Sequence, residues 1–173
     1  MTDNTKITEA LTSKKQAKPA LIPAAEAESR ITIHRIYLKN QQFVVSGMPD
    51  ELSSNWKPEI SLQANPQFSL LDSGQHEVVL TLNVSAQQSG KAIFQIQLDQ
   101  AGLFTLQNLP EDQQETVVYG VCPNMLFPYA AVAVNKLLSE AGLPHVYLNP
   151  LDFVTLYRQH QQQQQKEKLK SLK

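Results

Sequence analysis

The sequence contains a single cysteine, Cys122, among its 173 residues, and it has no long apolar run. One cysteine excludes an intrachain disulfide framework and every metal site built from several cysteines. The longest purely apolar run near the middle, Tyr129–Val134, is far shorter than the roughly 20 residues that a membrane-spanning helix needs. No apolar signal-peptide segment is visible near the amino terminus, so we expect a protein of the reducing cytoplasm.

Neither sign of charge dominates the composition. Fifteen basic residues oppose sixteen acidic ones, which leaves a formal net charge of -1. Dedicated nucleic-acid-binding proteins usually carry a strong basic excess, so this balance argues against that class. Apolar residues make up 42% of the chain, which is typical of a soluble globular domain with a buried core.

The charges are distributed unevenly along the chain. Residues 1–30 contain no aromatic residue and no sustained hydrophobic period, so we predict a disordered N-terminal arm there. Residues 31–160, the predicted globular domain, hold six basic and eleven acidic residues and are therefore acidic. Residues 161–173 begin with five glutamines and carry four lysines against one glutamate, which predicts a polar, basic tail that extends the last helix. These two ends either add solubility only or contact a partner.

Four segments with alternating apolar and polar residues predict β-strands in the first half of the core. Segment Ile31–Leu38 alternates with one slip near Arg35, which indicates a β-bulge. The other three, each with apolar residues at every second position, are segments 56–64, 77–84 and 92–99. Turn-forming residues separate the four segments and no helical pattern lies between them, so we predict one antiparallel sheet.

The second half of the core carries helical signals. Apolar residues in segment 111–121 recur at spacings of three and four, which predicts a first helix. Pro123 and Pro128 then punctuate the chain, and a second helix is predicted over 129–140. The dipeptide Asn149-Pro150 is typical of a helix start, so a third helix is predicted from there. Strands that precede helices in this way predict an α+β fold.

The sequence shows no catalytic or cofactor-binding motif. There is no glycine-rich phosphate loop and no Gly-x-Ser-x-Gly nucleophile motif. The four histidines have no metal-ligand spacing, so we expect no metal and no cofactor. Cys122 would be a nucleophile only with a histidine beside it in space, and a buried structural thiol is the stronger interpretation. We expect a protein without enzymatic activity; a small α+β enzyme built around Cys122 or a histidine is the competing hypothesis.

The segment Cys122–Tyr129, Cys-Pro-Asn-Met-Leu-Phe-Pro-Tyr, holds two prolines and two aromatic residues in eight positions. By itself it predicts a stiff apolar elbow, either in the core or in the wall of an apolar groove. This segment resembles the signature of SecB-type protein-export chaperones. The resemblance extends, in the same order, through segments 31–43, 56–59, 77–80, 102–104 and 148–153, and it ends in the glutamine-rich helix.

The resemblance implies a fold, an assembly and a set of partners. In that family the subunit is a four-stranded antiparallel sheet followed by helices packed on one face, and two dimers stack their helices between their sheets to form a homotetramer. The tetramer holds unfolded secretory precursors in a long apolar groove and passes them to the SecA motor ATPase without using ATP. A groove suits such clients because they offer apolar side chains but no fixed shape. We expect no nucleic-acid partner and no stable membrane insertion.

Carried over residue by residue, the resemblance assigns two sets of positions. The client-binding groove is expected at Trp56, Ile60, Leu62, Tyr129, Phe153 and Tyr157, with Phe43 and Phe127 as weaker candidates. The oligomer interface is expected at Ile96, Leu98 and Gln100. For each of these residues core packing is the alternative interpretation, because large apolar side chains are commonly buried.

The expected motor contact departs from the family pattern. The family docks its motor partly through carboxylates on the outward face of the sheet, whereas the matching positions here are neutral: Asn40, Val44 and Gln97, with Gln95 beside them. Loss of these charges predicts weaker steering and weaker docking to a basic partner. Nearby Asp99 is one substitute, and Asp50 or Glu51 would contribute if their loop folds back.

We therefore expect an ATP-independent chaperone that holds unfolded precursor proteins in an export-competent state and delivers them to SecA. The alternative is a SecB-like chaperone that serves a narrow client set, such as an antitoxin, and binds the motor weakly. Suppression of aggregation separates both from an enzyme, and binding to the motor separates one from the other.

Overall fold

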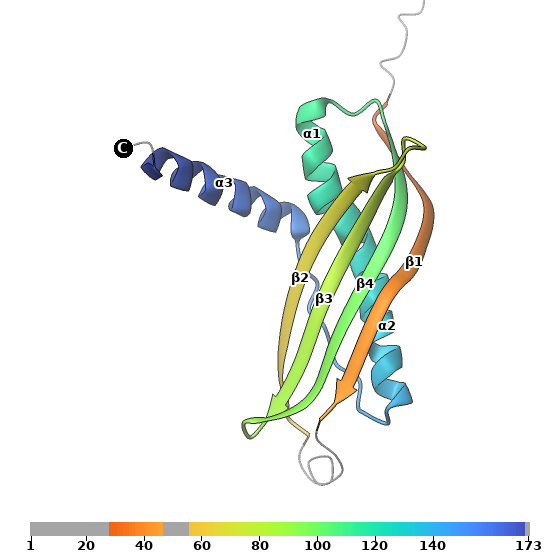
Figure 1. Cartoon of the computed structure of the whole chain (residues 1–173), viewed down its shortest axis with the longest axis vertical. Helices are drawn as coiled ribbons and strands as arrows, with labels where there is room; N and C mark the ends of the chain where they lie inside the picture. The colour runs from red at the N-terminus through yellow and green to blue at the C-terminus, as the bar shows by residue number, and fades with distance from the viewer. Residues whose placement is uncertain (1–27, 47–55, 172–173) are drawn as a thin grey trace, which may run out of the picture.

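The computed structural model describes residues 28–46 and 56–171, with side chains described as far as Lys166. The predicted N-terminal arm therefore lies almost wholly outside the described residues, as do the candidates Asp50 and Glu51. Within the described residues, a sheet of long strands is followed by a helical rod and a projecting helix (Figure 1).

The four strands form one antiparallel sheet in the order β1-β4-β3-β2, so the predicted sheet is confirmed. The strands are β1 (Arg30–Val45), β2 (Glu59–Leu70), β3 (His76–Gln88) and β4 (Lys91–Gln107). Each is longer than its apolar pattern predicts, and β2 begins at Glu59 rather than at Trp56. The register of β1 shifts between Ile33 and Arg35, as predicted, and shifts again between Leu38 and Asn40.

The helical half begins with one continuous rod rather than two separate helices. α1 (Glu111–Thr116) leads through the π-helical turn η2 (Val117–Val121) into α2 (Cys122–Glu140). The two prolines that were expected to punctuate the chain lie inside this rod. Because Pro123 has no N–H to donate, the turn before it widens, and the Cys122 N–H donates to the carbonyl of Val117, five residues back.

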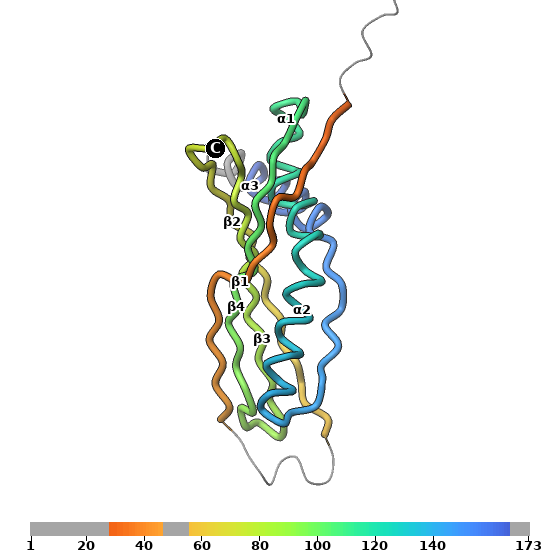
Figure 2. The backbone as a smooth tube through the Cα atoms, turned by 90° about the vertical axis from the view of Figure 1, so that its right-hand side faces the viewer, coloured from red at the N-terminus to blue at the C-terminus, as the bar shows by residue number. Residues whose placement is uncertain are grey.

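The rod packs against the two central strands of the sheet. α2 lies along β3 and β4 on one face (Figure 2). The core between them consists of side chains that are almost wholly buried, among them Leu80, Leu82, Phe94, Ile96, Leu98, Leu126 and Val134. Gly102 of β4 allows the close approach, because a Cβ there would lie 2.9 Å from a methyl carbon of Leu126. The predicted α+β fold is confirmed.

The rod is also apolar enough to be compared with a membrane span. By length and composition alone, Glu111–Glu140 passes as a helix that crosses a membrane. Half of its most apolar window is buried inside the folded chain, however. The core helix of a protein that never meets a bilayer has the same composition, so the packing on the sheet accounts for the apolar character.

One helix does not cover the whole face of this sheet. Four strands make a sheet roughly 19 Å wide, whereas a helix with its side chains is about 10 Å across. Apolar side chains of the two edge strands on the α2 side therefore stay partly exposed. These are Ile33, Leu38 and Val45 on β1, and Ile60, Phe68 and Leu70 on β2.

The last helix, α3 (Phe153–Ser171), leaves the body instead of packing on the sheet (Figure 1). The segment before it runs back along α2 and is held there by Asn135, whose side chain exchanges two hydrogen bonds of 3.0 and 2.9 Å with the backbone of Val146. The helix start predicted at Asn149-Pro150 is wrong by three residues. Asp152 caps the helix by accepting from the Thr155 N–H at 3.2 Å.

Candidate functional site

An apolar strip runs along β2 on the face of the sheet that carries α2. It consists of alternate residues paired with β3: Ile60, Leu62, Ala64, Pro66, Phe68 and Leu70. Phe68 is 40% exposed and Leu70 is 64% exposed. A strand rises roughly 3.3 Å per residue, so this β2 strip is about 33 Å long. It is long enough to lie against about ten residues of extended polypeptide.

The β2 strip widens into a pocket of about 520 Å³ where α3 leaves the body. Three parts of the chain form its wall: the middle of β2, the rod from α1 into η2, and the first turns of α3. The lining includes Ala64, Pro66, Glu115, Tyr119, Phe153, Leu156, Tyr157 and His160. We call this cavity the junction pocket, because it exists only where these three parts meet.

A row of aromatic rings crosses the floor of the site from the sheet to α3. The ring of His76 on β3 lies 6.4 Å from that of Phe68 on β2. Phe68 meets Tyr119 edge to face at 5.2 Å, and Tyr119 stacks on Tyr157 at 5.2 Å. Such pairs add to the stability gained from burial alone. The row offers flat apolar surface to a ligand and ties α3 to the body at the same time.

Polar groups edge the same pocket. The Tyr157 hydroxyl donates to the Glu115 carboxylate at 2.7 Å, and the Gln161 amide donates to the same oxygen at 3.1 Å. Gln161 also bonds to the Tyr157 hydroxyl. Partial burial, followed by the hydrogen bond to Glu115, raises the pKa of Tyr157 to about 12. Tyr157 therefore keeps its proton at neutral pH and remains a donor.

The position of α3 against the body depends on Gly120. A Cβ on Gly120 would lie 2.9 Å from the Cα of Val154, so a larger residue would push α3 away. The Asn124 side chain accepts from the Phe153 N–H at 3.1 Å, and the buried Phe153 ring lies 6.0 Å from that of Phe127. These contacts fix the direction in which α3 leaves, and with it the shape of the junction pocket.

The predicted client-groove residues fall into three groups. Phe153 and Tyr157 line the junction pocket, and Ile60 and Leu62 belong to the β2 strip. Trp56 lies just before β2, half-buried against the core. The other three lie elsewhere. Tyr129 is 54% exposed on α2, Phe43 lies beside Phe94 on the β1 side, and Phe127 is in the core. Their binding of clients stays a prediction.

Several residues of the site were missed by sequence reasoning, among them Phe68, Glu115 and Tyr119. Phe68 continues the alternation of the β2 strip, and the predicted strand stopped before it. Glu115 and Tyr119 are four residues apart, which puts them on one side of a helical rod. The spacing of four is visible in the sequence. It indicates a site only once α3 is known to lie opposite these two residues.

The predicted oligomer-interface residues lie inside this chain's own core. Ile96 and Leu98 are 2% and 0% exposed, and they face α2. Gln100 is 4% exposed and donates to the carbonyl of Tyr37 at 2.9 Å, which joins β4 to β1. The burial agrees with the core-packing alternative. A direct role for these residues between copies of the chain stays a prediction.

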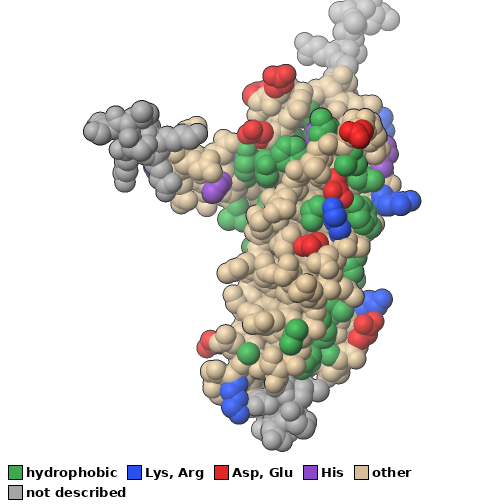
Figure 3. Space-filling view, in the orientation of Figure 1, with side chains coloured by type: hydrophobic (Ala, Val, Ile, Leu, Met, Phe, Trp, Pro, Cys, Tyr) green, Lys and Arg blue, Asp and Glu red, His purple; other side chains and the backbone are tan. Residues whose placement is uncertain are grey.

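The opposite face of the sheet is open and mostly neutral. Within the described residues no helix covers it, and Figure 3 shows few charged side chains over its central part. Val44, Gln95 and Gln97 edge a shallow hollow of about 290 Å³ there. Asn40 donates to the Asp99 carboxylate at 3.3 Å, and the Thr81 hydroxyl donates to it at 2.7 Å. Asp99, the proposed substitute acid, is therefore already engaged within the chain.

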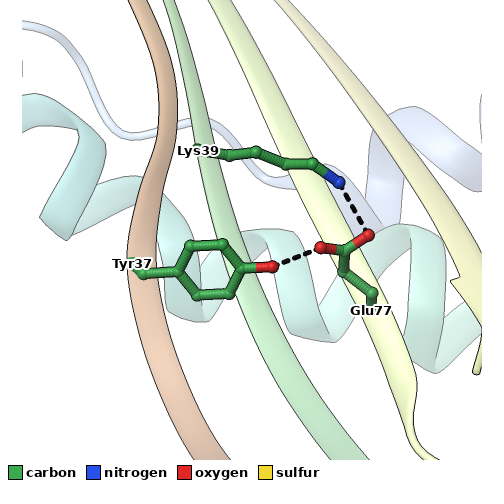
Figure 4. Close-up of polar contacts among 3 residues, drawn as sticks. All are labelled: Tyr37, Lys39 and Glu77. Carbon is green, nitrogen blue, oxygen red and sulfur yellow. Dashed lines mark hydrogen bonds and ion pairs between the residues drawn. The ribbon is translucent and has the colours of Figure 1, made fainter.

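A second carboxylate on this face is also paired (Figure 4). Glu77 on β3 accepts from the Lys39 ammonium at 2.8 Å and from the Tyr37 hydroxyl, both of which reach across β4 from β1. These hydrogen bonds, that of Lys39 first, hold the pKa of Glu77 below its usual value. The hydrogen bond to Glu77 is the main cause that raises the pKa of Tyr37 to about 12.

The chemistry of Cys122 is that of a core residue. The thiol is fully buried, and burial raises its pKa to about 12. A thiol in this state is protonated at neutral pH and is a poor nucleophile. Within the described residues, no group of three or more His, Cys, Asp or Glu side chains could hold a metal ion.

Comparison with known proteins agrees with this architecture. The family model described as "Preprotein translocase subunit SecB" matches residues 24–164. Protein-export protein SecB of Dechloromonas aromatica is 36% identical over 132 residues, 76% of this chain and 87% of that protein. The protein of the same name from Methylobacillus flagellatus is 31% identical over 143 residues, 83% of this chain and 91% of that protein.

A solved structure has the same fold. It is a SecB-like chaperone of Mycobacterium tuberculosis in complex with a peptide from the HigA1 antitoxin. Its TM-score is 0.60 at 20% identity, and the alignment covers 70% of this chain and 91% of that one.

The family model and the relatives define the class, which is that of the protein-export chaperones. The chain belongs to the SecB family of preprotein translocase subunits. The resemblance that segment Cys122–Tyr129 indicated is confirmed.

Proposed function

We propose that this protein is an ATP-independent chaperone that holds unfolded precursor proteins for export. The observation that carries the proposal is the β2 strip with the junction pocket at its side, an apolar track on the surface of a folded domain. An unfolded client offers apolar side chains in an extended chain, and a track of this kind binds it without requiring a fixed shape.

The energetics favour reversible binding. Each apolar side chain that the strip buries contributes roughly 1.5–3 kcal/mol. Ordering an unfolded client costs about 2–5 kcal/mol or more of this gross interaction energy. Several anchors must therefore act together, and no single sequence is required. Binding of this kind tolerates many clients and lets them go when a stronger acceptor arrives.

We propose that the working form is a homotetramer. Large apolar side chains remain exposed on the side of the molecule that carries α2: Tyr129 at 54%, Val132 at 71% and Tyr147 at 96%. The partly exposed residues of β1 lie on that side as well. Stacking of the α2 sides of two dimers would cover these residues. It would also repeat the client site around the assembly, which raises avidity without tightening any one contact.

We propose that clients are handed to SecA in the cytoplasm, through a weaker contact than a carboxylate-rich sheet face would give. Glu77 and Asp99 already accept hydrogen bonds from neighbouring side chains, and Val44, Gln95 and Gln97 carry no charge. The neutral face is the one observation that favours the alternative of a dedicated chaperone with weak motor binding. The names of the relatives, which are protein-export proteins, do not favour it.

Aggregation of a chemically denatured test protein, followed by light scattering on dilution, tests the proposal. Suppression without nucleotide at near one tetramer per client is the expected result, together with a native mass of four chains. A monomer that leaves aggregation unchanged would contradict the function and the assembly together. Pull-down of SecA then measures the motor contact separately.

A further inference from the structure

The chain before β1 is tethered to the loop that leads into α1. The Ser29 hydroxyl donates to the carbonyl of Asn108 at 2.9 Å, and the Asn108 amide donates to the carbonyl of Glu28 at 3.4 Å. Asn108 lies three residues before the start of α1. The N-terminal arm, residues 1–27, is therefore joined to the described chain near the loop that leads to the helix with Glu115.

The arm is long enough to reach the pocket. The three residues from Asn108 to Glu111 span at most about 11 Å, and the four helical residues from Glu111 to Glu115 add about 6 Å. The seven residues from Glu28 back to Leu21 span roughly 23 Å when extended, and the ten back to Lys18 span roughly 33 Å. Segment 14–22 is therefore within reach of the junction pocket of its own chain.

The chemistry of the segment matches the chemistry of the pocket. Residues 14–22, Lys-Lys-Gln-Ala-Lys-Pro-Ala-Leu-Ile, place three lysines before an apolar end. α1, Glu-Asp-Gln-Gln-Glu-Thr, has three acidic residues and no basic one. Among the described residues, Glu115 is the one carboxylate that lines the pocket, and no lysine or arginine lines it. The rings of Tyr119 and Tyr157 supply the apolar surface beside that charge.

The segment also lies outside the part of the chain that defines the family. The SecB family model begins to match at residue 24, so residues 14–22 precede it. The β2 strip and the junction pocket lie within the matched range, which ends at residue 164.

We propose that residues 14–22 bind in the junction pocket as an internal competitor of clients. Leu21 and Ile22 pack against the rings of Tyr119 and Tyr157. A lysine of the segment pairs with Glu115, since a carboxylate has two oxygens and can accept from the lysine while its Oε2 accepts from Tyr157 and Gln161. The inference rests on the proposed function, since it assigns a regulator to the same pocket. It goes beyond that function because it makes occupancy of the pocket depend on the chain's own arm.

Tethering makes a weak competitor effective. A segment on a short flexible linker acts at a local concentration in the millimolar range, so even a poor ligand fills the pocket when no client is present. A long unfolded client also binds along the β2 strip and displaces the segment. A short peptide that reaches only the pocket does not. The arm therefore selects for extended clients over fragments.

The test uses the full chain and a fluorescent, permanently unfolded client peptide that spans only the pocket. Its Kd is measured by anisotropy for the wild type and for the double variant Leu21→Ser/Ile22→Ser. We expect the double variant to bind the peptide three- to tenfold more tightly. The matched control, Ile7→Ser/Leu11→Ser, makes the same chemical change in the arm outside the segment and should leave the Kd unchanged.

A second measurement decides the inference independently of clients. A labelled synthetic peptide of residues 10–27 is titrated with the Leu21→Ser/Ile22→Ser variant, whose pocket is vacated. Saturable binding that Glu115→Gln weakens supports the inference. Equal Kd values for wild type and double variant, together with no binding of the arm peptide, would overturn it. Failure of the proposed function looks different, because then no variant binds the client or suppresses aggregation.

Discussion

The ring of Tyr157 on α3 lies flat on the ring of Tyr119 in η2, with centroids 5.2 Å apart and planes inclined by 11°. The same Tyr157 donates its hydroxyl proton to Glu115. One side chain thus joins α3 to the body and also forms part of the apolar wall of the junction pocket. The position of α3 and the shape of the proposed client site are therefore coupled.

Replacing Tyr157 by alanine should weaken client binding by about tenfold. The change removes the stack on Tyr119 and the apolar surface of the ring, and an aromatic pair alone contributes about 0.5–1.5 kcal/mol beyond burial. Anisotropy with a labelled unfolded client gives the Kd. Tyr157→Phe is the control, since it keeps the ring and should bind an apolar client nearly as well as the wild type. Loss of the native mass in Tyr157→Ala would instead mean that the residue is structural.

Alanine at Gly120 should destabilise the protein, although the same change in an ordinary helix stabilises it by up to about 1 kcal/mol. A Cβ there would press on the backbone of Val154 at 2.9 Å. Overpacking of this kind typically costs about 1–3 kcal/mol. Urea unfolding measures the free energy, and limited proteolysis tests whether α3 becomes accessible. An increase in stability would contradict the close seat of α3.

The contacts of Glu77 with Lys39 and Tyr37 should make stability depend on pH in the acid range. The pKa of Glu77 is lower in the folded state than in the unfolded chain, so its contribution is present above the unfolded value and is lost as the pH falls through the folded one. Glu77→Gln removes it, at a cost of about 1 kcal/mol at neutral pH because the pair with Lys39 is partly exposed. The difference in unfolding free energy between wild type and Glu77→Gln should therefore shrink from pH 7 to pH 3. A constant difference would show that the charge of Glu77 is immaterial.

The tetramer proposal predicts that Val132→Asp lowers the native mass from four chains to two. Val132 is 71% exposed on α2, so the change costs a single chain little, whereas a buried carboxylate between stacked helices is costly. Native mass spectrometry reads the result. The matched control, Val44→Asp, makes the same change at a side chain that is 56% exposed on the opposite face of the sheet and should leave the mass unchanged. A tetramer that tolerates Val132→Asp would place the contact elsewhere.

Acids placed on the open sheet face should strengthen docking of SecA. Val44→Glu and Gln97→Glu add charge beside the shallow hollow without removing a hydrogen bond that the structure shows. Asn40→Asp is a poor choice for the same purpose, because it sets a second carboxylate against Asp99 in place of a donor. SecA pull-down at low and high salt measures the gain, which should fade as salt rises. Unchanged binding would mean that docking does not use this face.

The sequence predicted the sheet more accurately than it predicted the helices. Alternation predicted four antiparallel strands, because one face of the sheet is buried by α2. Strand ends were missed because polar residues such as Gln107 still pair with a neighbouring strand. Pro123 and Pro128 were expected to punctuate the helical half. They lie within one rod, because the π-helical turn η2 widens the backbone before Pro123 and because the neighbours of Pro128, Leu126, Phe127 and Ala130, are buried and hold the rod in place.

Only part of the candidate site was predicted from the sequence. Phe153 and Tyr157 were predicted from the family resemblance and do line the junction pocket. Glu115 and Tyr119 line it because the chain turns back along α2 and brings α3 against η2, a position held by contacts such as that of Asn124 with the Phe153 N–H. Contacts between residues this far apart in the chain leave no local pattern.

Pro66 gives the β2 strip one further property. Proline is accommodated in an edge strand where its nitrogen faces away from the neighbouring strand, and the pairing of β2 with β3 continues through Pro66 without a shift. The outer border of β2 therefore lacks one backbone donor halfway along its length. A polypeptide that added to this border as a fifth strand would lack one backbone hydrogen bond at Pro66, which disfavours continuous edge-to-edge pairing along β2.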